Sequence, residues 1–160
     1  MLKYAGICIL SVSMAIYGVI KSSEIKKSLT LRKSVAELLC YIENNVTYAG
    51  KSKNDIYKSF SPSCNQVSSF LIDLSNDGNI RESINKHLDI LNKEDRRMLE
   101  TFFTEFGKST RREKEAKSCR LFREEFEKQG IDTEKEQMNK ILLYRKLGII
   151  FALITAVIFL

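Results

Sequence analysis

The residues whose side chains can do chemistry are few in this chain and widely separated. His87 is the single histidine, and the four cysteines are Cys8, Cys40, Cys64 and Cys119. No two cysteines form a C-x-x-C pair, and His87 lies far from a cysteine in sequence, so no zinc-site spacing is present. A lone histidine without a nucleophile motif does not predict a catalytic triad. We expect His87 to have a surface or capping role.

Nucleotide and carboxylate chemistry are not indicated either. The chain contains no G-x-x-x-x-G-K-[ST] loop, so it is not expected to hydrolyse a nucleotide by the P-loop route. The carboxylates Glu124 and Glu125 stand among arginines and lysines on a charged helix. Spacings of four residues there predict solvated ion pairs worth about 0.2–0.5 kcal/mol each, namely Glu113–Lys117, Arg120–Glu124 and Glu124–Lys128. The sequence therefore predicts a protein that is not an enzyme and has no cofactor or metal.

Charge is distributed unevenly along the 160 residues. The chain has 26 Lys+Arg against 20 Asp+Glu, a net charge of +6, and no acidic residue before Glu24 or after Glu136. Much of the basic surplus flanks the two apolar ends, where an anionic membrane surface accounts for it. No basic stripe is interleaved with aromatic residues as base stacking requires, so nucleic-acid binding is not predicted.

Two uncharged segments at the ends are candidates for membrane helices. A helix that spans a bilayer needs about 17–25 residues. Tyr4–Ile20 meets this requirement at its lower end. Its exit lacks the A-x-A pattern of a cleaved signal peptide, so residues 1–20 are predicted to be an uncleaved anchor. Leu147–Leu160 alone is too short for a typical membrane span. The segment can be extended to about 20 residues only if Arg145 and Lys146 snorkel, that is, place their charged ends at the lipid headgroups. It either crosses the bilayer, inserts in it, or is a buried core helix; we expect one of the first two.

Basic residues near the ends of these segments predict their orientation. Only Lys3 lies on the outer side, whereas nine basic residues lie on the inner side: Lys21, Lys26, Lys27, Arg32, Lys33, Lys135, Lys140, Arg145 and Lys146. Because basic flanks stay in the cytoplasm, residues 21–146 are predicted to face the cytoplasm from the cell membrane. The scattered cysteines agree, since cytoplasmic thiols stay reduced.

Residues 21–146 show the 3.6-residue periodicity of helices and little strand alternation. We therefore predict an all-α fold: a compact antiparallel bundle of about six helices, flanked by membrane helices at 1–20 and 147–160. The expected helices lie near 29–49, 54–60, 67–77, 80–91 and 92–106, followed by a long one from Ser109 or Thr110. Their apolar stripes are predicted to form the core rather than a ligand site.

Local signals mark where several helices begin and end. Asn92 is a predicted N-cap, with the Asp95 carboxylate as an acidic partner for the first-turn N–H groups. Gly50 and Gly107 are predicted helix stops. Residues 127–137 hold one apolar side chain, which predicts a polar, solvated stalk leading from the bundle to the last apolar segment.

The chain, from its N-terminal anchor onward, resembles a known family over nearly its whole length. Leu31–Ala49, which includes Glu43 and Tyr48, is similar to the leucine-rich helix of the stage III sporulation protein AB family of endospore-forming bacteria. Leu91–Ser109 is similar to that family's following element, and the charged helix and the terminal apolar segment come in the same order. The proline that follows the tyrosine helix in the family is absent after Tyr48.

The resemblance implies a function. It implies a helical bundle like the cytoplasmic domain of the platform protein in type II secretion and type IV pilus machines. The role implied is that of a mother-cell adaptor in the channel complex to the forespore, with a secretion-type ATPase, stage III sporulation protein AA, and other channel-complex proteins as partners. We take Glu43, Tyr48, Lys108 and Ser109 as the candidate partner-binding residues. The alternative is a small membrane-anchored ligand-sensing or regulatory helical protein unrelated to secretion.

Overall fold

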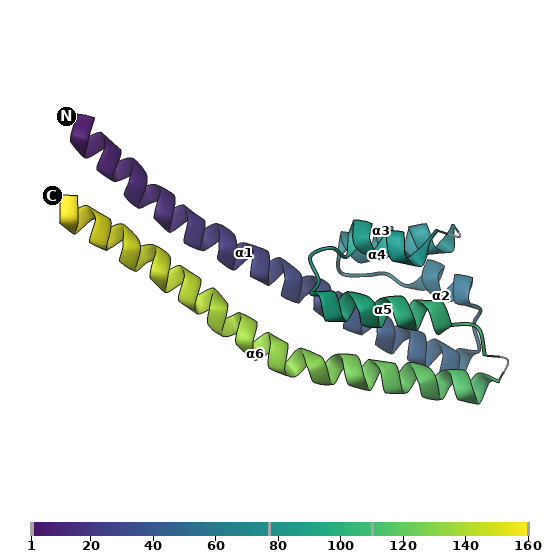
Figure 1. Ribbon diagram of the computed structural model, residues 1–160. Coiled ribbons are helices and arrows are strands. Elements are labelled where there is room, and N and C mark those ends of the chain that lie inside the picture. The colour runs from purple at the N-terminus through teal and green to yellow at the C-terminus, as the bar shows by residue number, and fades with distance from the viewer. Residues whose placement is uncertain (1, 77, 110, 160) are drawn as a thin grey trace. The chain divides into compact units, whose positions relative to one another are not determined.

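The computed structural model is all-helical over the residues that it describes, 2–76, 78–109 and 111–159, with side chains left out of the description at 2–11, 132, 156, 158 and 159. No strand occurs in these ranges, so the predicted all-α class is confirmed. The elements in Figure 1 are α1 (Leu2–Asn44), the π-helical turn η1 (Asn45–Ala49), α2 (Lys53–Ser59), α3 (Asn65–Ser75), α4 (Ile80–His87), α5 (Lys93–Glu105) and α6 (Arg112–Phe159).

The chain forms two compact units. The first, which we call the hairpin unit, contains residues 1–29 and 132–160, and the second, the bundle unit, contains residues 30–131. Helices α1 and α6 each contribute to both units, whereas α2 to α5 belong to the bundle unit alone.

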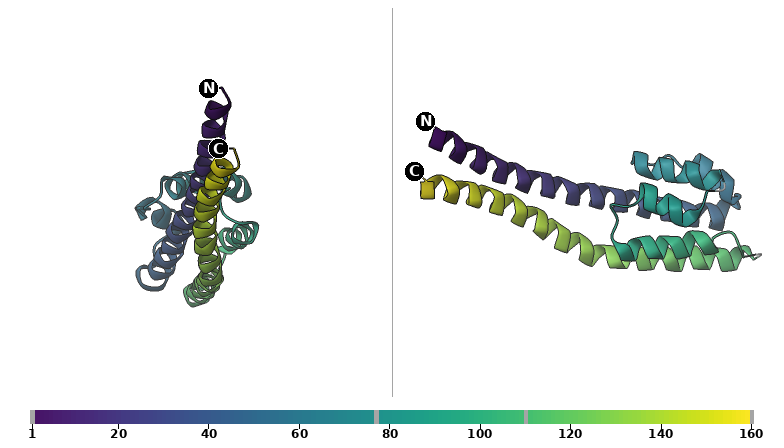
Figure 2. Two further views of the ribbon diagram at one scale, coloured as in Figure 1. Left: turned by 90° about the vertical axis from the view of Figure 1, so that its left-hand side faces the viewer. Right: turned by 45° about the horizontal axis from the view of Figure 1, so that its top comes forward.

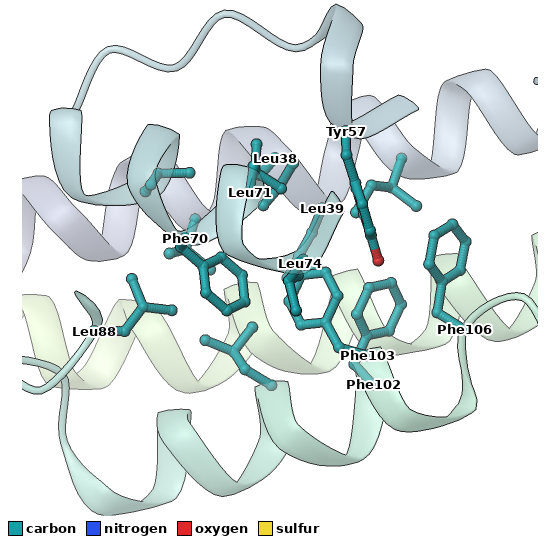
Figure 3. Packing of buried hydrophobic residues seen from close by; sticks show 14 of the residues in the cluster. Leu38, Leu39, Tyr57, Phe70, Leu71, Leu74, Leu88, Phe102, Phe103 and Phe106 are labelled. Atoms are coloured by element: carbon teal, nitrogen blue, oxygen red, sulfur yellow. The ribbon is translucent and has the colours of Figure 1, made fainter. Parts of the chain in front are cut away.

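Apolar stripes of the helices meet in the core of the bundle unit, as their spacing predicts. Phe70 of α3 packs edge-on against Phe103 of α5 at a ring-centroid distance of 5.1 Å, and Phe102 stacks on Phe106 at 5.5 Å. Figure 3 shows these rings beside the leucines of α1, with the Tyr57 ring of α2 at one end of the cluster. This aromatic packing joins α1, α2, α3 and α5 around one core.

Three residues predicted to mark helix ends lie at the beginning or the end of helices in the bundle unit. The Asn92 carboxamide accepts a hydrogen bond from the Asp95 N–H at 2.7 Å, which confirms Asn92 as the N-cap of α5. Gly50 follows η1 with a φ of 60°, the left-handed conformation that glycine adopts at little cost. Gly107 follows α5 with a φ of 85°. Both glycine stops are thereby confirmed.

Among the charged residues, Arg32 differs most from its predicted role. Its guanidinium donates from Nε to Asp95 Oδ2 at 2.9 Å and from Nη2 to the Phe126 carbonyl at 2.7 Å. Both side chains of the pair are buried, at 11% and 2% exposure. Arg32 was counted among the membrane-flanking cations and Asp95 among the helix-capping carboxylates; instead, tertiary contacts pair them inside the bundle unit.

Gly130 gives Arg32 the room it needs. A Cβ atom at position 130 would lie 1.8 Å from Arg32 Nη1, which is inside van der Waals contact. The guanidinium also lies over the Phe126 ring, 4.3 Å from its centroid, so that α6 supplies a face for it. The segment 127–137 was expected to be a solvated stalk, but at Gly130 it is buried against Arg32.

In the hairpin unit, α1 and α6 run antiparallel and side by side, as both views of Figure 2 show. Gly18 and Gly148 face each other where the helices are closest: a Cβ on Gly18 would lie 3.2 Å from Gly148 Cα and 2.7 Å from the Tyr144 carbonyl oxygen. One helical turn away, Arg145 Nε donates to Ser22 Oγ at 3.0 Å. Small residues at this crossing let the two backbones approach.

Within the described part of the chain, none of the helices is both long enough and apolar enough to cross a membrane. The predicted flanking membrane helices are therefore not supported by the described residues. The predicted anchor at 1–20 lies in large part outside them, since side chains 1–11, including that of Cys8, are not described. The same holds for positions 156 and 158–160 of the predicted segment 147–160.

We predict that Asp95→Asn lowers the free energy of unfolding by about 3–5 kcal/mol, because it leaves the Arg32 charge buried without a counter-ion. Urea unfolding of the full chain in detergent measures this effect. Glu100→Gln, on the same helix as Asp95, is the matched control: it breaks the exposed bridge from Glu100 to Arg81 of α4 and should change the free energy by no more than about 0–1 kcal/mol. Equal effects of the two substitutions would contradict the assigned role of Arg32.

Candidate functional site

An open groove in the bundle unit is the candidate site. Its volume is about 570 Å³, and it lies between the end of α1 with η1 on one side and the first half of α6 on the other. The first wall carries Glu43, Asn44, Thr47 and Tyr48, and the second carries Ala116, Lys117, Arg120, Leu121 and Glu124.

Arg112 positions the first wall of this groove. It lies in the first turn of α6 and donates from Nε to the Val46 carbonyl at 2.9 Å and from Nη2 to the Thr47 carbonyl at 2.8 Å. These carbonyls belong to the last turn before Gly50, where a helix has unpaired acceptors and a negative dipole end. The cation therefore ties η1 to α6 and fixes the turn that bears Tyr48.

The turn η1 is π-helical, a rare form that occurs often at functional positions. Asn45 donates from its side chain to the Tyr41 carbonyl at 2.8 Å, and Val46 is buried in the core. Tyr48 points outward and is 81% exposed, so it contributes nearly its whole ring to the surface. The hydrogen bonds at both ends of the turn therefore hold the backbone that presents this exposed ring to solvent.

Arg123 joins the two walls on the core side of the groove. Its guanidinium forms a short ion pair with Glu43 from α1 and donates to Glu127 Oε2 at 2.8 Å. These hydrogen bonds, to Glu43 first and Glu127 second, raise the pKa of Arg123 above its usual range. Glu43 is only 17% exposed and serves first to hold α1 against α6. A charge reversal at Glu43 would therefore damage the fold as well as any contact.

The outer rim of the groove on α6 is charged and partly paired. Arg120 Nε donates to Glu124 Oε1 at 2.8 Å, and this bond lowers the pKa of the Glu124 carboxyl. The predicted Arg120–Glu124 pair is thus confirmed. Lys117 makes no ion pair with any described residue, so the predicted Glu113–Lys117 pair is not formed. Leu121 lies between these charges and is 56% exposed.

The structure brings together two of the four predicted partner-binding residues. Glu43 and Tyr48 line the groove, whereas Lys108 and Ser109 lie in the α5–α6 connection and do not. Lys108 bridges to Glu105 at 3.3 Å and is 61% exposed, and Ser109 Oγ donates to the Arg111 carbonyl at 3.3 Å.

Lys117 and Leu121 also line the groove, although neither was predicted to belong to a site. The position of Leu121 could have been noticed in the sequence. It is an apolar residue that does not belong to the core-facing stripe of Cys119, Phe122 and Phe126, and it lies on an otherwise charged face of the helix. His87 and Cys119 lie outside the groove. His87 Nε2 lies 2.7 Å from Asp73 Oδ2, and burial raises the pKa of the Cys119 thiol to about 12. In the described ranges, no cluster of three or more metal-ligating side chains is found.

We predict that Arg112→Ala accelerates amide hydrogen exchange at residues 45–49 and lowers the free energy of unfolding by about 1–2 kcal/mol, because two carbonyls lose their charged donor. Arg111→Ala removes a neighbouring exposed arginine and is the control, expected to leave both quantities unchanged. Unaltered exchange in Arg112→Ala would show that η1 holds its conformation without the cap.

Comparison with known proteins assigns the chain to a family. The family model for stage III sporulation protein AB matches residues 3–160, nearly the whole chain. Searches of curated proteins and of solved structures gave no match. The match includes both walls of the groove and the Arg32–Asp95 pair, and it agrees with the resemblance of Leu31–Ala49 and Leu91–Ser109. The chain belongs to the stage III sporulation protein AB family, and its role is in sporulation.

Proposed function

We propose that this sporulation protein is a non-catalytic membrane platform of the mother cell–forespore channel complex, and that its bundle unit docks a secretion-type ATPase like stage III sporulation protein AA. The observation that carries this proposal is the groove: a preorganised, solvent-facing surface with an exposed tyrosine and leucine, built on two helices that a network of buried and half-buried ion pairs holds in place.

The composition of the core favours an adaptor over the ligand-sensing alternative. A ligand-binding bundle needs polar side chains on core-facing positions. In the described part of the bundle unit, the buried charged side chains Arg32 and Asp95 satisfy each other. The other buried polar groups there are few and include Ser34, Ser83 and the Tyr57 hydroxyl. A mainly apolar core favours recognition at the surface.

Exposed apolar side chains of the hairpin unit support membrane attachment. They are Val12, Met14, Ile16, Tyr17, Val19 and Ile20 on α1 and Leu142, Leu143, Ile149, Ile150, Phe151, Leu153, Ile154 and Val157 on α6. An exposed apolar surface on two closely packed helices fits a lipid environment. In this proposal the hairpin unit lies in the mother-cell membrane and the bundle unit faces the cytoplasm.

Docking is tested by co-purification of the full chain, in detergent, with the stage III sporulation protein AA ATPase. We expect Tyr48→Ala to weaken binding about tenfold, because a large exposed ring at a groove contributes more than its neighbours. Ile72→Ala, which shortens an exposed apolar residue on α3 outside the groove, should bind within about twofold of the wild type. If the wild-type chain does not bind the ATPase, the platform proposal is wrong.

Membrane attachment is tested by carbonate extraction of cells that express the full chain. Ile150→Asp should release a larger soluble fraction than the wild type, since a charged residue within a membrane segment costs about 2.5–3.5 kcal/mol. Ile72→Asp places the same charge at an exposed apolar position of the bundle unit and should leave the fractionation unchanged. Complete extraction of the wild-type chain would exclude membrane insertion.

A further inference from the structure

One of the charges that line the groove has no ion-pair partner. Both carboxylates of the groove have arginine partners: Glu43 is paired with Arg123, and Glu124 with Arg120. Lys117 has no such partner among the described residues. The lining charge that is left unpaired is therefore the ammonium group of Lys117 on the α6 wall.

A partner that covers this groove must supply a counter-ion for Lys117. A buried ammonium without an acceptor is costly, so an entirely apolar partner surface would bind poorly there. Leu121 and Tyr48, exposed at 56% and 81%, offer apolar contacts beside the lysine. The groove thus selects a mixed surface, apolar and acidic.

The shape of the groove favours a helix as the occupant. Both walls are helical, and the α6 wall extends from Ala116 to Glu124, about 12 Å at the rise of an α-helix. This length matches two to three turns of a partner helix in the helix-in-groove mode. No strand edge is present in the described part of the chain, so strand addition has no template there.

We propose that the groove receives an amphipathic helix of two to three turns that brings a carboxylate to Lys117 and an apolar side chain between Leu121 and Tyr48. The identification of the ATPase as the protein that supplies this helix rests on the proposed function. The chemistry of the occupant follows from the groove alone.

The first experiment measures the affinity of the full chain, in detergent, for the ATPase. Lys117→Glu should weaken binding at least about tenfold, and Lys117→Gln should weaken it less and reduce its salt dependence. Lys114→Glu, one turn earlier on the same helix and outside the groove, is the matched control and should bind within about twofold of the wild type. Melting temperatures identify any variant that is unfolded. Wild-type affinity in both Lys117 variants would overturn the groove proposal and leave the platform proposal standing.

A second experiment does not depend on the ATPase. The probes are two designed helical peptides of about fourteen residues that share a leucine face and differ by Glu or Lys at one position beside it. The Glu peptide should bind the full chain at least about tenfold more tightly than the Lys peptide, and Lys117→Glu should reverse this order. Equal binding of the two peptides, or no binding of either, would overturn the assigned chemistry even if the ATPase binds elsewhere. Binding of the Glu peptide with no ATPase binding would refute the platform proposal alone.

Discussion

The bundle unit depends on one buried charge. The guanidinium of Arg32 is out of water, and it stays there because α5 gives it a carboxylate and α6 gives it a carbonyl, an aromatic face and the space beside Gly130. Each helix therefore has a required position relative to this single side chain. Apolar packing alone tolerates shifted arrangements of similar helices, whereas a buried ion pair penalises any arrangement that separates it. We infer that the pair sets the register of α1, α5 and α6.

That register determines the surface. With α1 and α6 antiparallel at Arg32, their facing positions bring Glu43 to Arg123 and the end of α1 to Arg112. Arg123 and Arg112 thus extend the contact between α1 and α6 as far as η1, where Tyr48 is exposed. The groove is thus a consequence of how two helices are held together. Its two carboxylates are paired with arginines, whereas Lys117 on the exposed wall has no ion pair with a described residue.

Periodicity predicted most of the bundle unit because its core is apolar and α2 to α5 are short helices with one buried face each. The spacing of Phe102, Phe103 and Phe106 identified α5 and its buried face, and Asn92 and Gly107 marked its ends. The candidate site was predicted in part. Tyr48 and Glu43 lie together, but Lys108 and Ser109 lie in a separate connection, and Lys117 and Leu121 were not predicted to line the site. Sequence spacing shows which residues share a helix face, but not which face of another helix lies opposite.

The helical class, the apolar stripes, the caps, the family and the lack of recognisable catalytic motifs could all be read from the residue order, because each depends on residue types at short separations. The roles of the charged residues became visible only in the folded chain. Arg32 looked like a membrane-flanking cation and Asp95 like a cap, yet the two are partners 63 residues apart. The same applies to Glu43 and Arg123, separated by 80 residues. The strength of a charge pair depends on distance and burial, and neither can be read from the order of residues along the chain.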